Sequence, residues 1–201
     1  LGLQFTYFNF GPGKPVVTPV PTYENVGDVP DEAIAENRDW TGSMKLNGTT
    51  LKFKLDGVNA PQAVASFVTL AKKGFYENNK CHRITVSGIY VLQCGDPTGD
   101  GTGGPGFSFG PIENAPIDDI YRQGYLAYAR TGNNAFSMGS QFFIVYSNST
   151  IPRDAAGGYS VFGYVDTGIE EVLGIAAKGV ADGSSDGKPV APAVISQVTV
   201  K

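Results

Sequence analysis

The chain has 201 residues, and its 15 Lys and Arg against 19 Asp and Glu give a formal net charge of −4. A surface of that sign does not attract phosphate backbones, so nucleic acid is not an expected partner. His82 is the only histidine, and the two cysteines, Cys81 and Cys94, form no C-x-x-C pair. This composition excludes the usual zinc sites and any catalytic triad without His82, and we expect neither a metal nor a cofactor.

Residues 1–39 are predicted to precede the folded domain, which would occupy residues 40–201. Leu1–Phe10 is apolar and aromatic. It is interpreted either as a terminal strand or plain chain boundary, or as the remainder of a removed signal or membrane anchor. Gly11–Thr22 contains four prolines and favours an extended, polyproline-like tether. Tyr23–Asp39 is polar and acidic, which predicts an irregular lead-in with one short helical turn.

The first part of the domain predicts a hairpin followed by a helix. Trp40–Leu46 and Thr50–Leu55 flank Asn47-Gly48, the strongest short-range signal for a tight turn between antiparallel strands. Pro61 then stands where proline fits the first turn of a helix. The apolar residues after it recur at helical spacing and would form one face; they are Val64, Phe67, Val68 and Ala71.

The rest of the chain is rich in short strands. A second helix is predicted at Ile169–Lys178, where apolar residues repeat the helical spacing. The other apolar runs are short and bounded by turn residues; they are Cys81–Val86, Ile89–Gln93, Tyr125–Ala129, Gln141–Tyr146, Val161–Val165 and Val194–Val200. About eight short strands with one early and one late helix predict a mainly β fold, a closed antiparallel barrel capped by the two helices.

Several sequence blocks, in a fixed order, carry a resemblance to a known family. The run from Phe67 to Asp96 contains F-x-x-L-x-x-x-G-F-Y, then C-H-R-I, then Q-x-G-D. Downstream follow G-T-G-G at 101–104, G-S-Q-F-F-I at 139–144 and V-F-G-Y-V at 161–165. Together they resemble the cyclophilin-type peptidyl-prolyl cis/trans isomerases over residues 40–201, in a form closer to the bacterial members.

The resemblance implies an eight-stranded antiparallel barrel with two capping helices and a substrate groove on its outer face. It also implies catalysis of Xaa-Pro rotation, whose barrier of about 18–20 kcal/mol comes from resonance between nitrogen and carbonyl. A donor on the prolyl nitrogen draws its lone pair out of that resonance, and an always-charged guanidinium suits this task. Arg83 occupies the family's catalytic arginine position. No nucleophile, metal or cofactor is required.

The resemblance also assigns the substrate groove. Gln93 would hold the substrate backbone and help orient Arg83, and Phe143 would form the base of the proline pocket. For Phe143 a purely core role is the alternative. The other groove positions implied by the family are Tyr90, Val91, Gly101, Ala129, Arg130, Thr131, Gln141, Ile151 and Tyr159. Within the segment 129–131, the backbone would offer hydrogen-bonding groups to the peptide.

This sequence departs from the family pattern around the groove. The loops at 84–92 and 130–139 are each two residues longer than usual, so the alignment inside them can slip by a residue or two. Ile151 or Pro152 stands where many members carry a tryptophan beside the proline pocket, and Tyr159 stands where the common pattern has a histidine. Because cyclosporin uses that tryptophan in many members, we expect cyclosporin to bind this protein weakly.

The two cysteines bear on the location of the protein. Cys81 and Cys94 would end two neighbouring antiparallel strands joined through the Ser87-Gly88 turn, nearly opposite each other. A disulfide and two buried free thiols are the alternatives. With the Pro-rich tether, a disulfide favours an extracytoplasmic domain in the cell envelope, anchored through an N-terminal segment. A cytoplasmic location stays open.

The predicted function is acceleration of Xaa-Pro rotation in proline-containing polypeptides by a monomer, which assists protein folding. Two alternatives keep the fold: a catalytically weak proline-peptide binding module, and a holdase-type chaperone whose N-terminal segment contacts its clients. Removing residues 1–39 would separate the last alternative from the others, because an isomerase keeps its activity on short peptides.

Overall fold

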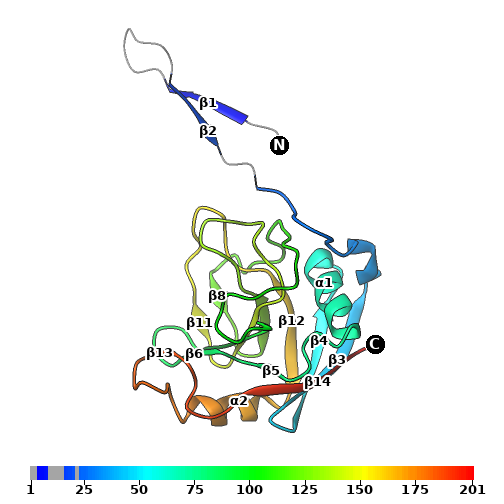
Figure 1. Cartoon of the computed structure of the whole chain (residues 1–201), viewed down its shortest axis with the longest axis vertical. Helices are drawn as coiled ribbons and strands as arrows, with labels where there is room; N and C mark the ends of the chain where they lie inside the picture. Colours follow the sequence, from blue (N-terminus) through cyan, green and yellow to red (C-terminus); the bar gives the residue numbers. More distant parts are fainter. Residues whose placement is uncertain (1–3, 9–15, 21–22) are drawn as a thin grey trace.

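The computed structural model describes residues 4–8, 16–20 and 23–201. It contains two α-helices and many short strands (Figure 1), so the predicted mainly β fold with two helices is confirmed. The helical elements are η1 (Glu32–Ala35), α1 (Pro61–Lys72) and α2 (Ile169–Ala176). The strands are β1 (Gln4–Phe8), β2 (Val16–Val20), β3 (Asp39–Leu46), β4 (Thr49–Asp56), β5 (Asn79–Lys80), β6 (Arg83–Thr85), β7 (Val91–Cys94), β8 (Ile120–Tyr121), β9 (Tyr125–Tyr128), β10 (Phe142–Val145), β11 (Ser149–Thr150), β12 (Val161–Thr167), β13 (Asp186–Gly187) and β14 (Val194–Val200).

One large antiparallel sheet of ten strands forms the body of the protein. Its hydrogen-bonded order is β13-β6-β7-β10-β9-β12-β4-β3-β14-β5. The expected number was about eight. The count is higher because the segment 79–85 is divided into β5 and β6, and because β13 adds a strand outside β6. The predicted hairpin of β3 and β4 is present. Asn47 and Gly48 both have positive φ angles, 49° and 88°, which the tight turn between these strands requires.

The segment 79–85 connects distant parts of this sheet. The N–H of Cys81 donates to the carbonyl of Ala193, just before β14, at 2.8 Å. The N–H of the next residue, His82, donates to the carbonyl of Gln93 on β7 at 3.1 Å. Because β14 and β7 are far apart in the strand order, the sheet curls so that this one segment reaches both.

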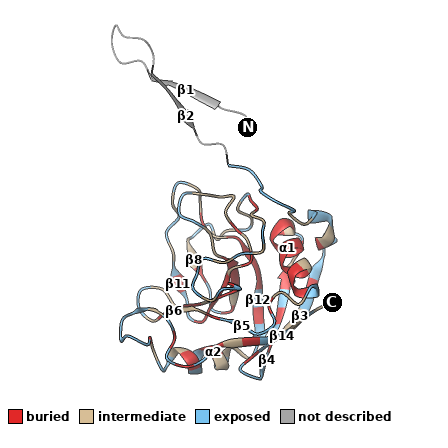
Figure 2. Cartoon of the chain, viewed as in Figure 1, coloured by how far each residue is buried: buried red, intermediate tan, exposed pale blue. Residues whose placement is uncertain are grey.

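Side chains of the sheet face two separate hydrophobic clusters. On β10, Phe142 and Ile144 point into the main core, which also contains Phe53, Phe67 and other buried residues. The alternating residues Phe143 and Val145 belong to a smaller cluster on the other face. Figure 2 shows buried residues on the strands and on the side of α1 that faces the sheet. The smaller cluster is the part of the fold that positions the candidate site.

The two helices begin as predicted. Helix α1 begins at Pro61, and nine of its residues are buried, so the helix covers one opening of the curled sheet. Helix α2 begins at Ile169 and ends at Ala176, two residues before the predicted Lys178, because the last backbone bonds there are of the shorter turn type, from the N–H groups of Lys178 and Gly179.

The folded domain begins before the predicted boundary at Trp40. The indole Nε1 of Trp40 donates to the carbonyl of Ala35 at 2.9 Å, and both side chains are buried. Upstream, Val26 forms a two-bond bridge with Ser108. The predicted short helical turn is η1, so the lead-in from Asn25 onward packs onto the domain although its composition is polar and acidic.

The N-terminal strands differ from the predicted tether in one respect. Strand β2, at Val16–Val20, pairs antiparallel with β1 at Gln4–Phe8 in a separate two-stranded sheet. The prolines and glycines at 11–15 and residues 21–22 lie outside the described residues. Within the described part of the chain, no helix is long and apolar enough to cross a membrane.

A disulfide joins Cys81 and Cys94. Cys94 is the last residue of β7 and directly follows Gln93, and Cys81 precedes β6 by two residues. The bridge is buried and ties the segment 79–85 to β7 beside the residues that the sequence analysis assigned to the groove.

Candidate functional site

Arg83 lies at the start of β6, between β13 and β7. Its Nε and Nη2 donate to the two carboxylate oxygens of Asp186, each at 2.7 Å. Its Nη1 donates to Oε1 of Gln93, the residue opposite Arg83 on β7, at 3.0 Å. The guanidinium is thus held at both edges, and its side chain is 40% exposed, so it remains open to a ligand.

A chain of side-chain amides continues from Gln93 across the sheet. Nε2 of Gln93 donates to Oε1 of Gln141 at 2.9 Å. Nε2 of Gln141 in turn donates to the carbonyls of Gly101 and Gly103, each at 2.9 Å. This network connects Arg83 to the glycine loop, so that the predicted residues from three distant sequence blocks meet in one place.

The glycine loop needs its glycines at this point. Gly101 has a φ of +94°, which L-residues rarely adopt, and a side chain at Gly103 would collide with the carboxylate of Asp96 and with Thr98. Asp96 accepts the backbone N–H groups of Thr98 and Gly101, so a single buried carboxylate shapes the loop. The loop then presents its carbonyls to Gln141.

An apolar pocket of about 160 Å³ lies beside Arg83. Its walls come from β6, β7, β10 and the loops after β9 and β11. The lining residues are Arg83, Ile89, Val91, Gln93, Ala129, Arg130, Phe143, Ile151 and Tyr159. Phe143 forms an edge-to-face contact with Tyr159, with ring centroids 5.5 Å apart. Phe143 is therefore both a pocket wall and a member of the outer hydrophobic cluster.

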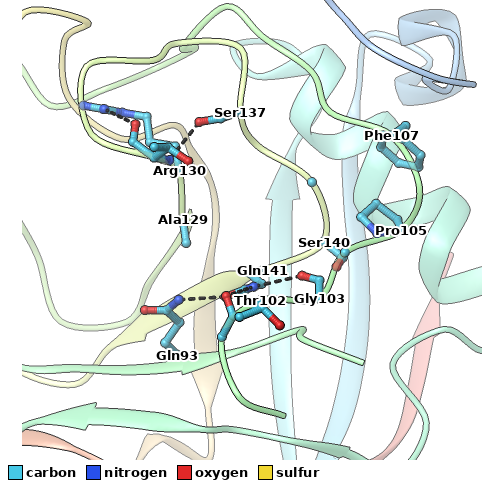
Figure 3. Close-up of a pocket in the computed structure, with 14 residues that line it drawn as sticks. Gln93, Thr102, Gly103, Pro105, Phe107, Ala129, Arg130, Ser137, Ser140 and Gln141 are labelled. Atoms are coloured by element: carbon cyan, nitrogen blue, oxygen red, sulfur yellow. Dashed lines mark hydrogen bonds between the residues drawn. The ribbon is translucent and has the colours of Figure 1, made fainter. Parts of the chain in front are cut away.

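A second, more polar pocket of about 280 Å³ adjoins the first and shares Gln93, Ala129 and Arg130 with it. Gly101, Thr131 and Gln141 line this second pocket. Figure 3 shows Gln93 and Gln141 linked at its base, with Pro105 and Phe107 on the opposite side. The two pockets together form one continuous groove through these shared residues.

The guanidinium of Arg130 is turned away from this groove (Figure 3). It forms a bidentate ion pair with Asp154, at 2.9 Å to each oxygen, and donates to the carbonyls of Gly157 and Gly158. Its side chain is only 1% exposed. In the described part of the chain, the Arg130 N–H and the Ala129 carbonyl form no hydrogen bond with the protein. These two backbone groups are therefore free of hydrogen bonds with the described protein, whereas the Arg130 guanidinium is fully occupied.

The structure places Tyr90 differently from the sequence-based expectation. Its ring packs on Tyr146, with centroids 5.9 Å apart, and it lines neither pocket. Ile89 lines the apolar pocket in its place. The reason is the period of two along the chain here: Val91 and Gln93 line the pocket, so Ile89 shares their face and Tyr90 faces the main core.

The electrostatics of the site favour a charged arginine next to a neutral histidine. The hydrogen bond to Asp186 raises the pKa of Arg83 above its usual range. Burial lowers the pKa of the neighbouring His82, and the charge of Arg83 lowers it further, against the carboxylates of Asp96 and Asp100. Among the described residues, no group of three or more His, Cys, Asp or Glu side chains is placed to hold a metal ion.

Three residues that build the site were not found by sequence reasoning. Asp186 is 103 residues from Arg83 and sits in a turn-rich segment without a motif. Tyr121 is buried beneath the pocket, where its hydroxyl accepts the N–H of Tyr159 at 2.7 Å. Ile89 lies two residues before Val91 and shares its face. Only Ile89 had a signal in the sequence, namely its spacing of two and four residues from Val91 and Gln93, which were both assigned to the groove.

The site thus combines an arginine, an adjacent apolar pocket and unpaired backbone groups on the outer face of the sheet. The family described as "Cyclophilin type peptidyl-prolyl cis-trans isomerase/CLD" matches residues 42–200. The chain therefore belongs to the cyclophilin family of peptidyl-prolyl isomerases.

Relatives with assigned names agree with this family. The chain is 42% identical over 170 residues to "Probable peptidyl-prolyl cis-trans isomerase B" of Mycobacterium tuberculosis, covering 78% of this chain and 53% of the relative. It is 37% identical over 197 residues to the protein of the same name in Mycobacterium leprae, covering 92% of this chain and 62% of the relative. The chain thus spans between about half and three-fifths of the length of these mycobacterial relatives.

Solved structures are also similar. Two crystal structures of a cyclophilin type peptidyl-prolyl cis-trans isomerase from Cryptosporidium parvum align with TM-scores of 0.68 and 0.66, each at 30% sequence identity. They cover 82% and 80% of this chain, and 98% of the solved chain in both cases. The second was determined in the presence of the dipeptide Ala-Pro.

Proposed function

We propose that this protein catalyses the cis/trans isomerisation of Xaa-Pro bonds in polypeptides. The observation that carries the proposal is Arg83, held by Asp186 and Gln93 at the rim of an apolar pocket. A prolyl ring fits such a pocket because it is small and apolar, and its nitrogen would then lie at the rim. The presence of Ala-Pro in a related structure supports a proline-containing ligand.

The chemistry follows from the donors of the groove. Arg83 would donate an N–H to the prolyl nitrogen, which weakens the amide resonance and favours the twisted transition state. Gln93 uses one amide N–H for Gln141, so its other N–H is left for a substrate carbonyl. The backbone of Ala129 and Arg130 would hold the peptide in an extended form. Only hydrogen bonds and shape are needed, and no covalent intermediate forms.

The test is isomerisation of a short Ala-Ala-Xaa-Pro-Phe peptide by the intact chain and by Arg83→Ala. Losing one positioned donor typically costs about 2.7–4 kcal/mol, so we expect the rate acceleration to fall by roughly 10²–10³. Far-UV and near-UV circular dichroism control for folding. Peptide binding without any acceleration by the intact chain would contradict the proposal and favour the weak binding module instead.

We also propose that the curled sheet is a closed barrel of eight strands. The support is that β5 and β6 are consecutive parts of one segment, hydrogen-bonded to β14 through Asn79 and Lys80 and to β7 through Arg83 and Ile84. Counting β5 and β6 as one strand and leaving out the short edge strand β13 gives eight. Hydrogen exchange tests this: slow exchange of the Cys81 and His82 amides is expected, and fast exchange would contradict closure.

We further propose that the protein assists folding outside the cytoplasm of a bacterium and acts as a monomer. Disulfides persist in oxidising compartments, and Cys81 and Cys94 are bridged. Arg83, both of its hydrogen-bonding partners and the pocket beside it are assembled by this chain itself, so the proposed site needs no residue from a second subunit. Alkylation of the protein taken directly from its native cells decides the first point: two labelled thiols without reductant would contradict it.

A further inference from the structure

The carboxylate of Asp186 binds the Nε edge of the Arg83 guanidinium with both of its oxygens. Nε donates to Oδ1 and Nη2 donates to Oδ2, each at 2.7 Å, so the contact is bidentate. Nη1 donates to Gln93 at 3.0 Å. A guanidinium has five N–H groups. Three are therefore occupied by the protein, and the two that remain belong to Nη1 and Nη2.

The backbone places Asp186 without help from this ion pair. Strand β13 pairs with β6 so that Asp186 lies opposite Thr85, which makes Arg83 its diagonal neighbour, within reach of a long side chain. The N–H of Val86 donates to the carbonyl of Ser185 at 2.8 Å, and the hydroxyl of Ser184 donates to the carbonyl of Asp186 at 3.0 Å. The carboxylate is thus presented to Arg83 by a segment with its own hydrogen bonds.

The ion pair is suited to orientation more than to stability. The side chains of Arg83 and Asp186 are 40% and 50% exposed, and ion pairs in such positions contribute little to the free energy of unfolding. An arginine side chain has many rotamers, however, and a bidentate partner selects one of them. The same contact lowers the pKa of Asp186, so the carboxylate is ionised at neutral pH.

We propose that Asp186 is a positioning residue of the isomerase site: its carboxylate occupies the Nε edge of Arg83 and thereby directs the two remaining N–H groups toward the prolyl nitrogen. The inference rests on the proposed isomerase function. It extends that function to a residue that does not line either pocket and that no sequence block of the groove contains. Asp186 would act only through Arg83.

The test compares Asp186→Asn with a matched control, Asp182→Asn, in the intact chain. Both remove one negative charge from the same segment, but within the described residues the hydrogen-bond partner of Asp182 is Ser184, not Arg83. A misplacement of about 1 Å can cost roughly 10²-fold in rate. Because Gln93 still holds Nη1 in the variant, we expect a smaller loss, about tenfold in kcat/KM for Asp186→Asn. For Asp182→Asn we expect kcat/KM to change by less than about twofold, because surface substitutions have small effects.

A double variant separates positioning from structural support. In an Arg83→Ala background, Asp186→Asn should cause no further loss, because the side chain that it positions is gone. Peptide affinity, measured by NMR titration, should stay within about twofold in Asp186→Asn, since the pocket walls are unchanged. The Nε–H resonance of Arg83 should be sharp in the wild type and exchange-broadened in Asp186→Asn.

Three results would overturn the inference: equal rates for the two single variants, an equal loss in the Arg83→Ala background, or a faster Asp186→Asn variant. The last would mean that the carboxylate weakens Arg83 by compensating its charge. If the wild type itself gives no acceleration, the proposed function fails. The Nε–H resonance of Arg83 then still shows whether Asp186 fixes the side chain.

Discussion

Phe142 and Phe143 are adjacent aromatic residues with different surroundings. Phe142 is packed between Phe67 and Tyr76 in the main core, whereas Phe143 lies on the outer face against Tyr121 and Tyr159. The period of two along a strand produces this division. One residue supports the fold and the next forms a wall of the pocket.

His82 gives a prediction at the same scale. Its pKa in the folded protein lies below the usual 6.5 because of burial and of Arg83, with Asp96 and Asp100 acting in the opposite direction. The native state therefore binds fewer protons than the unfolded state. The resulting stability is present above about pH 6.5 and is lost as the pH falls through the folded pKa, with a slope of at most about 1.4 kcal/mol per pH unit.

Urea unfolding at pH 7.5, 6.5 and 5.5 measures this slope. We expect the unfolding free energy of the wild type to fall between pH 7.5 and 5.5, and that of His82→Asn to fall less. The comparison of slopes is independent of any constant loss caused by the substitution. Parallel pH dependences in the two proteins would show that His82 makes no such contribution.

The residues of the site were predictable to different degrees. Arg83, Gln93 and Phe143 lie on strands, and Gln141 directly precedes one, so the motifs and the strand period of two allowed their meeting in one groove to be predicted. The direction of Arg130 could not, because it depends on Asp154, which approaches from a separate loop. Asp186 likewise is brought to Arg83 only by tertiary pairing of β13 with β6.

At the scale of elements, the start of α1 depends on a distant residue. Its N-cap residue, Ala60, has no side-chain cap. Glu113 supplies one instead, accepting the N–H of Gln62 at 3.1 Å and that of Ala63 at 2.9 Å. Its own N–H donates to the hydroxyl of Ser160 at 2.8 Å. Glu113 therefore connects α1 to the chain just before β12.

We expect Glu113→Ala to lower the free energy of unfolding by about 1–2 kcal/mol, since helix caps contribute amounts of this size. Glu77→Ala is the matched control: Glu77 is exposed in the turn after α1, and a surface change there should stay within about 0.5 kcal/mol. Chemical denaturation of both variants measures the difference. Equal losses for the two would contradict the capping role.

The strands and helices themselves were largely predictable, and their ends less so. The Asn47-Gly48 turn and the apolar face of α1 are local signals, and both are confirmed. The division of 79–85 into two strands is not local, because it depends on β14 and β7 pairing with different parts of that segment. Short strands at positions 120–121 and 149–150, which pair only with each other, also lacked a sequence signal.

At the scale of the whole molecule, the boundary of the domain determines which truncation is informative. Residues 25–39 pack onto the domain through Val26, Ala35 and the indole of Trp40. Removing residues 1–39 would therefore damage the fold itself, so a loss of activity would not identify a holdase. Removal of residues 1–22 keeps the hydrogen bonds by which Asn25, Val26 and Ala35 join the domain.

We expect the chain without residues 1–22 to keep its melting temperature and its activity on short peptides. The chain without residues 1–39 should lose at least about 2 kcal/mol, which lowers Tm by about 4–8 °C in a domain of this size. Differential scanning calorimetry and the peptide assay measure both. Loss of peptide isomerisation on removing residues 1–22 alone would mean that the N-terminal segment takes part in the activity.

Strand β14 lies between β3 and β5, although it is formed from the last part of the sequence, Val194–Val200. During synthesis, β3 and β5 therefore have unpaired backbone edges until β14 has been made, and such edges readily pair with other chains. The Cys81–Cys94 bridge needs only the hairpin of β6 and β7, so it can form while that gap is still open. The chain would thus be vulnerable to aggregation until β14 has been synthesised, and an early disulfide would hold the hairpin of β6 and β7 in its native pairing during that time.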